Sequence, residues 1–176
     1  MSYEAWRYAV EEGADWFELA DRAARQAPTR EQWECQRGCA HCCHLLVEVT
    51  AAEAEALSRV VTPPIRARIE ANAGRVAGLN PAQYRALRQP CAFLGDEGEC
   101  LAYDVRPLRC RAHVSSSEQV CRRVLKGDPT TPSGSVPGDV WLATVIAAIQ
   151  TGLGTGTGTG TGTAPETEEL HTALAS

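Results

Sequence analysis

Cysteine is the residue that most constrains this chain, because eight cysteines lie in groups along it instead of being spread evenly. They are Cys35, Cys39, Cys42, Cys43, Cys91, Cys100, Cys110 and Cys121. The N-terminus has acidic and aromatic residues where a secretory signal needs a positive start and an unbroken apolar run, so we expect a cytoplasmic protein. In a reducing compartment, cysteines are thiols or metal-bound thiolates. We therefore predict that all eight bind metal.

The adjacent pair Cys42 and Cys43 is the most informative part of this pattern. A disulfide scaffold is the alternative that an even number of cysteines allows. Neighbouring residues point their side chains in different directions, which weakens that alternative and also makes it hard for both sulfurs to reach one ion. Eight thiolates can fill two tetrahedral zinc sites, or they can hold one four-cysteine cluster beside a second site or spare thiols.

Spacing in the first group is compatible with both kinds of metal. Cys35, Cys39 and Cys42 can hold three corners of an iron-sulfur cluster while a distant cysteine supplies the fourth. Cys39-x-x-Cys42 alone is a zinc-knuckle spacing. The same loop is similar to that of radical SAM enzymes, but the strand-helix alternation of their barrel is absent here.

Length and hydrophobic periodicity predict a mainly α fold, a small helical domain held together by metal, with one short β-hairpin. The 176 residues suit one core, which we place at residues 1–150. Gly-Thr alternation from Thr151 to Thr163 buries no apolar surface, so we expect a flexible C-terminal tail over 151–176. The turn-forming residues 95–98 lie between two short apolar runs, which indicates the hairpin over 91–103.

Helix boundaries follow from capping residues. We expect a helix over 3–25 that is broken at Gly13, and further helices after the caps Thr50, Asn80, Ser115 and Asp139. Cys121 is then in a first helical turn, where the helix dipole favours a thiolate.

The charge balance limits the classes of partner. A net charge of −5 argues against nucleic acid, whose binding depends on clustered Lys and Arg. The most apolar stretch, Val140 to Ile149, is too short to span a bilayer. We therefore expect metal ions and a protein as partners, with no nucleic acid and no membrane.

Histidine and arginine side chains are expected around the sulfurs. His41, His44 and His113 can ligate zinc or iron, but eight thiolates leave them little vacancy, so we expect them to orient ligands or to lie at the surface. Arg106, Arg109 and Arg111 could donate hydrogen bonds to sulfur or offset thiolate charge, with surface salt bridges as the alternative. For Arg106 we expect a structural turn that packs the side chain over the site.

The ordered set of cysteine motifs resembles a known family. The resemblance runs from Cys35-Gln-Arg-Gly-Cys39-Ala-His-Cys42-Cys43 through Cys91-Ala-Phe-Leu94, Cys100-Leu-Ala-Tyr103, Arg106-Pro107 and Cys110-Arg111 to Cys121. This set of motifs is similar to that of the YkgJ-like cysteine-cluster proteins, which are described as a zinc- or iron-chelating domain with a CxxCxxCC signature. The resemblance implies a cysteine-bound metal centre. Flagellin lysine methylases look similar in the cysteine region, are associated with an iron-sulfur cluster and are considerably longer.

The leading interpretation is a metal-binding cysteine-cluster protein with an iron-sulfur cluster, 4Fe-4S being favoured over zinc, and a redox, metal-delivery or accessory role. One alternative is a structural zinc module for protein interaction. The other is a metal-dependent modifying enzyme, which needs an open coordination position. The sequence assigns no catalytic residue.

Overall fold

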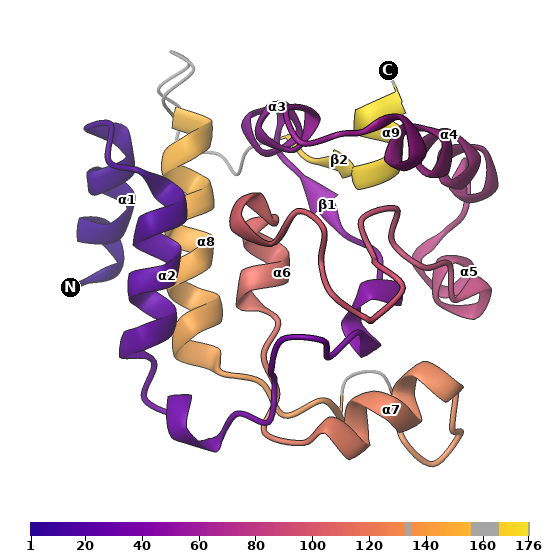
Figure 1. Ribbon diagram of the computed structural model, residues 1–176. Coiled ribbons are helices and arrows are strands. Elements are labelled where there is room, and N and C mark those ends of the chain that lie inside the picture. The colour runs from indigo at the N-terminus through magenta and orange to yellow at the C-terminus, as the bar shows by residue number, and fades with distance from the viewer. Residues whose placement is uncertain (133–134, 156–165, 176) are drawn as a thin grey trace.

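A computed structural model describes residues 1–132, 135–155 and 166–175 of the chain. It is mainly helical, as predicted (Figure 1). None of the helices in these ranges combines the length and the apolar character that crossing a bilayer requires. The fold has two hydrophobic cores, and the cysteine-bearing segments pass between them.

The first core is built from the two ends of the main domain. Helices α1 (Tyr3–Glu11) and α2 (Trp16–Gln26) are separated at Gly13, whose φ of +88° requires glycine, so the predicted break is confirmed. Helix α8 (Val140–Thr155) lies beside α1 and α2, and the short α6 (Leu108–Ala112) packs against α2 and α8 (Figure 1). The buried side chains of this core include Trp6, Val10, Leu19, Leu108, Leu142, Ile146 and Ile149.

The second core is built around two helices of the middle of the chain, α3 (Ala51–Ser58) and α4 (Pro63–Val76). Helix α5 (Pro81–Leu87) follows α4. Both predicted caps are present: Thr50 with Glu53 and Asn80 with Gln83 form reciprocal capping boxes. The buried side chains of this core include Val49, Leu57, Ile65, Ile69, Phe93, Leu170 and Leu174.

A two-stranded antiparallel pairing is present, but its place in the chain differs from the prediction. Strand β1 (Glu48–Val49) pairs with β2 (Glu168–Glu169), with Glu48 opposite Glu169. The predicted hairpin over 91–103 is a turn closed by a single bridge between Leu94 and Cys100. Pairing stops there because the Cys91 N–H donates to the Cys43 carbonyl, and because the chain turns into a 3-10 helix at Tyr103–Val105.

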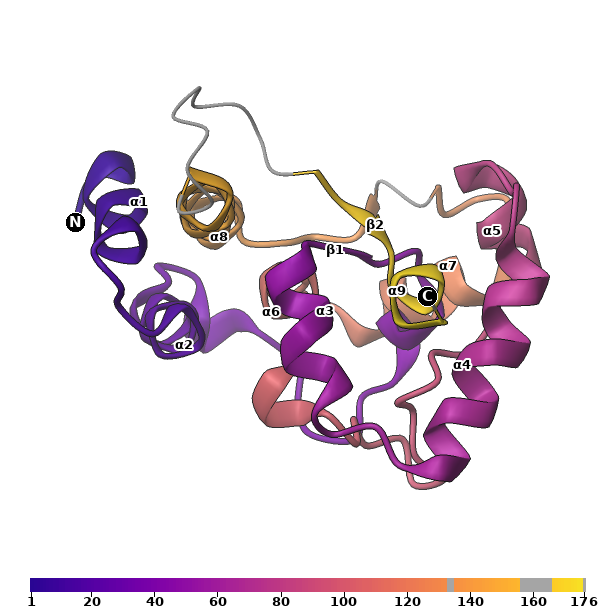
Figure 2. The same cartoon turned by 90° about the horizontal axis from the view of Figure 1, so that it is seen from above.

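The end of the chain packs onto the second core, which differs from the flexible tail expected over 151–176. Helix α9 (Leu170–Ala175) lies against α4, and Leu170 and Leu174 are buried at helical i,i+4 spacing (Figure 2). Helix α8 also extends past residue 150, to Thr155. The Gly-Thr tract over 156–165 lies outside the described residues.

Helix α7 (Glu118–Lys126) carries Cys121 in its first turn, as predicted, but begins two residues later than its expected cap. The cap is Ser117, whose hydroxyl accepts from the Val120 N–H at 3.3 Å. Ser115 cannot cap the helix because its hydroxyl is bonded to the N–H and the carbonyl of Ser117. Gly127 ends the helix with a φ of +69°.

Candidate metal centre

Cys35 is the first cysteine of the loop that leads from the first core, and it is fastened to the segment before α7. The Glu34 N–H donates to the Ser115 carbonyl at 3.0 Å, and the Ser115 N–H donates to the Cys35 sulfur at 3.1 Å. The Glu118 N–H also donates to the Glu34 carboxylate at 2.6 Å. These contacts bring the loop to the segment that carries Cys121, although about 80 residues separate them in sequence.

Cys42 and Cys43 lie in a 3-10 helix, His41–His44, at the middle of the site. This tight helix points neighbouring side chains in different directions, although the two thiols still share a side-chain hydrogen bond. That bond is the largest cause of the raised pKa of Cys42, followed by burial. The Cys43 carbonyl accepts from the Cys91 N–H at 2.8 Å, which joins the first group of cysteines to the distal ones.

Two glycines allow the loop over 34–44, which we call the proximal loop, to approach the turn after Cys91. Gly38 and Gly98 have φ values of +88° and +80°, a region that favours glycine. A Cβ on Gly98 would lie 2.7 Å from the Gly38 carbonyl oxygen, so a side chain there would push the two segments apart. This contact places the turn between Cys91 and Cys100 beside Cys39.

Most of the cysteine side chains line one cavity. Its volume is about 750 Å³, and its walls come from the proximal loop, the turn over 91–103 and α6. The cysteines that line it are Cys35, Cys39, Cys42, Cys43, Cys91, Cys100 and Cys110. Cys121 lines a neighbouring cavity of about 460 Å³, in which Cys42 also takes part. Cys42 therefore faces both spaces.

Electrostatic effects between the thiols separate them into two groups. Burial raises the pKa of Cys35, and Cys39, Cys42 and Cys121 raise it further; we call Cys35, Cys39 and Cys121 the Cys35 group. Burial also raises the pKa of Cys110 well above its usual value, and Cys91, Cys42 and Cys100 add to the effect; we call Cys91, Cys100 and Cys110 the Cys91 group. Cys42 acts on both groups, so it lies between them.

Arg106 lies beside the sulfurs, as the sequence predicted for its turn. Its guanidinium lies 4.5 Å from the centre of the Tyr103 ring, and it counteracts the rise in pKa that other causes impose on Cys42, Cys100 and Cys110. Its Nε is buried and has no hydrogen-bond partner in the structure. A buried cationic donor next to thiols is suited to stabilising thiolate sulfur, so the donor set fits a thiolate-bound metal.

The sulfurs are close together but do not yet form a finished coordination shell. All eight cysteines are free thiols. Within the described part of the chain, no three Cys, His, Asp or Glu side chains are arranged closely enough to hold an ion. Metals bind the thiolate form of cysteine, so metal binding to these side chains would release protons.

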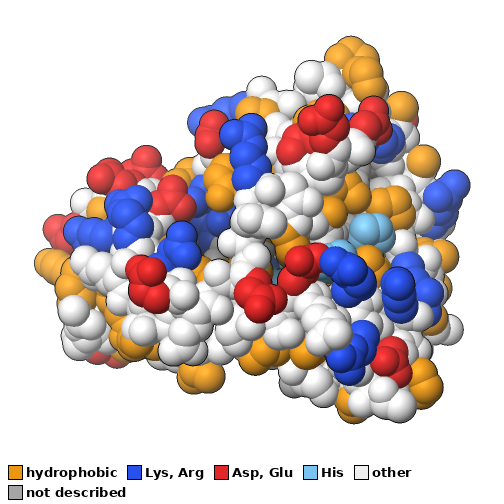
Figure 3. Space-filling model, turned by 60° about the horizontal axis from the view of Figure 1, so that its bottom comes forward, with side chains coloured by type: hydrophobic (Ala, Val, Ile, Leu, Met, Phe, Trp, Pro, Cys, Tyr) orange, Lys and Arg blue, Asp and Glu red, His pale blue; other side chains and the backbone are white. Residues whose placement is uncertain are grey.

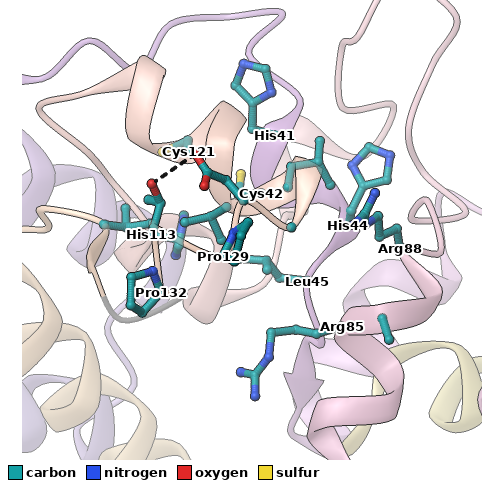
Figure 4. A pocket seen from close by; sticks show the side chains of 17 residues that line it. His41, Cys42, His44, Leu45, Arg85, Arg88, His113, Cys121, Pro129 and Pro132 are labelled. Atoms are coloured by element: carbon teal, nitrogen blue, oxygen red, sulfur yellow. Dashed lines mark hydrogen bonds between the residues drawn. The ribbon is translucent and has the colours of Figure 1, made fainter.

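The three histidines lie around the smaller cavity. His41 Nε2 lies 3.0 Å from a Glu118 carboxylate oxygen, and burial lowers the pKa of His113. His44 Nδ1 is buried without a partner. Figure 4 shows the three rings with Cys42 and Cys121 around this space.

Two further residues support the site, and only the first was considered from the sequence. Arg111, one of the arginines expected beside the sulfurs, is buried and bonds to the Asp21 carboxylate and to the carbonyls of Asp104 and Arg106, which fixes the turn before Cys110. His171 accepts from the Ala92 N–H at 3.2 Å, beside Cys91. No local pattern marks His171, because its partner lies 79 residues away.

Comparison with known proteins gives one match. The model of the CxxCxxCC family, described as a "putative zinc- or iron-chelating domain", matches residues 34–124. Those residues include all eight cysteines. The comparison with curated proteins gives no match, and neither does the comparison with solved structures.

Proposed function

Because this chain belongs to the CxxCxxCC family of zinc- or iron-chelating domains, we propose that it holds two metal centres through its eight cysteine thiolates. The Cys35 group supplies three ligands to one centre and the Cys91 group supplies three to the other. Cys42 and Cys43 each complete one of the two sets. The observation that carries this proposal is the place of Cys42, whose side chain lines both cavities.

The adjacent pair supports this division. Two neighbouring thiols seldom reach one ion, but they can serve two ions on either side of the 3-10 helix that carries them. Cys43 is tied through its carbonyl to Cys91, and Cys42 faces both cavities. Four sulfurs per ion is the ligand set of a closed, tetrahedral zinc site.

Such sites stabilise a fold and leave no position for substrate. The Cys35 group joins the proximal loop to α7, and the Cys91 group joins the turn over 91–103 to α6. When bound, the metal supplies cross-links between short segments that lie far apart in the sequence. We therefore propose a structural zinc module as the leading function.

An iron-sulfur protein with a redox or metal-delivery role is the second candidate. The observation that favours it is the cavity of about 750 Å³ lined by seven cysteines, which is larger than a single ion needs. A 4Fe-4S cluster also takes four thiolates, and donors such as Arg106 Nε tune cluster potentials.

Anaerobic purification followed by elemental analysis and absorption spectroscopy tests the proposal. We expect a colourless protein with two zinc ions per chain. Cys35→Ser and Cys110→Ser are each expected to lose one ion and keep the other, whereas Ser116→Ala keeps both. A brown protein with iron and sulfide would favour the second candidate. Loss of both ions from either cysteine variant would contradict two independent centres.

A further inference from the structure

The smaller cavity, of about 460 Å³, opens on the face of the molecule formed by α5 and α7. We call it the arginine pocket. Figure 3 shows Lys and Arg side chains near histidines on this face, with Asp and Glu side chains beside them. The pocket is lined by Arg85 and Arg88 and by one carboxylate, that of Asp128, so its lining has more positive than negative charge although the chain has a net charge of −5. An anion is therefore attracted to this lining.

Two arginines at the edge of the pocket have no acidic partner. Arg85 and Arg88, at the end of α5, form no ion pair with any described carboxylate. The acidic side chains nearby are already engaged: Glu118 pairs with His41 and Arg122, and Asp128 accepts hydrogen bonds from Thr130 and Thr131. The two guanidinium groups are thus free for an external anion.

The backbone at Arg88 is unusual for an arginine. It caps α5 with a φ of +50°, and it is the non-glycine residue with positive φ among those described. Glycine or asparagine normally takes this place, because a larger side chain is strained in this conformation. Arg88 Nη2 lies so near Gly127 that any side chain at position 127 would clash with it. The strained backbone thus carries a side chain that reaches toward α7.

Much of the rest of the pocket is apolar, with Leu45, Val124, Leu125, Pro129 and Pro132 in its lining. The polar lining residues include Asp128 and His44, whose Nδ1 has no partner. The lining therefore combines two guanidinium groups with apolar side chains (Figure 4). A few polar groups on an apolar surface are typical of a small-molecule site.

We propose that the arginine pocket binds a small organic anion, whose carboxylate or phosphate is held by Arg85 and Arg88 and whose apolar part lies against Val124 and Leu125. Guanidinium groups bind either anion through paired hydrogen bonds. The bound molecule lies next to Cys42 and Cys121. This binding function does not require that the metal centres be zinc or iron.

Titration calorimetry on the full, metal-containing chain tests the proposal with phenyl phosphate, phenylacetate and the neutral phenylacetamide. We expect both anions to bind and the amide to bind at least about 10-fold more weakly, because it lacks a charge for the arginines. The ranking of the two anions identifies the preferred group. Inorganic phosphate is expected to bind more weakly than phenyl phosphate, since it lacks the apolar part.

Arg85→Gln and Arg88→Gln are each expected to weaken anion binding by about 10-fold. Arg59→Gln is the matched control, because Arg59 is exposed on α3 and pairs with Glu55. In the wild-type protein, backbone amide resonances of Val124, Leu125 and Gly127 should shift on titration. Equal binding of amide and anions, equal loss in the control, or unshifted pocket resonances would overturn the proposal. Metal content is measured in the same samples, so that metal loss and anion loss are read separately.

Discussion

His171 connects the end of the chain to the candidate metal centre through a single ring. Its side chain is 2% exposed. Its Nε2 accepts from the backbone N–H of Ala92 and from the side-chain amide of Asn72, so its proton is on Nδ1. Nδ1 in turn donates to the Glu169 carboxylate at 2.8 Å. The orientation of the backbone beside Cys91 therefore depends on a side chain far away in the sequence.

Glu169 makes this connection sensitive to acid. Burial raises the pKa of its carboxyl, but the hydrogen bonds from the His171 ring and from the Thr172 N–H outweigh burial, so the net pKa is below the ordinary value of 4.5. A carboxyl with a depressed pKa in the folded state stabilises the fold above its unfolded pKa, and this contribution is lost as pH falls through the folded pKa. We expect Glu169→Gln to lower the unfolding temperature at pH 7, and the difference from wild type to shrink below about pH 4.5.

Thermal unfolding of both proteins from pH 7 to pH 3 measures this difference. A difference that stays constant or grows as the pH falls would contradict the role given to Glu169.

At the scale of elements, Glu53 joins two helices that belong to different parts of the fold. It is fully buried; one carboxylate oxygen accepts from the N–H and hydroxyl of Thr50, and the other accepts from the Leu108 N–H at 2.7 Å. It thus caps α3 and also satisfies the N-terminus of α6, the helix that carries Cys110. A negative charge is favourable at both helix N-termini.

We expect Glu53→Ala to reduce the free energy of unfolding by roughly 2–4 kcal/mol, because it leaves buried N–H donors of Thr50 and Leu108 without a partner. Glu55→Ala is the control on the same helix: Glu55 is exposed and pairs with Arg59, so its loss should cost at most about 0.5 kcal/mol. Denaturant unfolding at pH 7 measures both. Equal losses in the two variants would show that Glu53 does not connect α3 to α6.

Local signals predicted most of these elements, and non-local contacts account for those that differ. The break at Gly13 and the caps at Thr50, Asn80 and Asp139 depend on residues within four positions, so they can be read from sequence. The pairing of β1 with β2 joins segments about 120 residues apart, and no local pattern marks it. Ser115 matched a capping pattern, but its hydroxyl bonds to Ser117 instead.

For the candidate site, the sequence supplied the residue types and their order but not their grouping. Grouping depends on contacts such as that between Cys35 and Ser115, and on the close approach of Gly38 and Gly98. It also depends on the Cys43 carbonyl, which any residue could provide at that position. Backbone contacts of this kind leave no trace in side-chain chemistry.

At the scale of the whole molecule, the cysteines lie between two hydrophobic cores, and we expect the first core to depend less on bound metal than the second. The first core contains large buried side chains such as Trp6, Leu142 and Ile146, and its helices α1, α2 and α8 contain no cysteine. The cysteine-bearing segments are short: a loop, a bridged turn, and helices α6 and α7 of five and nine residues. Helices this short are marginal without tertiary support.

Removing metal should therefore loosen the molecule unevenly. Thiolate-metal binding can contribute on the order of 10 kcal/mol, comparable to the whole stability of a domain. Hydrogen exchange measured with and without a strong chelator is expected to show loss of protection at residues 35–45, 91–103 and 118–126. The amides of α1 and α8 should keep their protection from exchange, because Trp6 and Ile146 are buried and these helices contain no cysteine. Uniform loss along the chain would mean that the two cores form one cooperative unit, and unchanged protection throughout would mean that metal does not cross-link these segments.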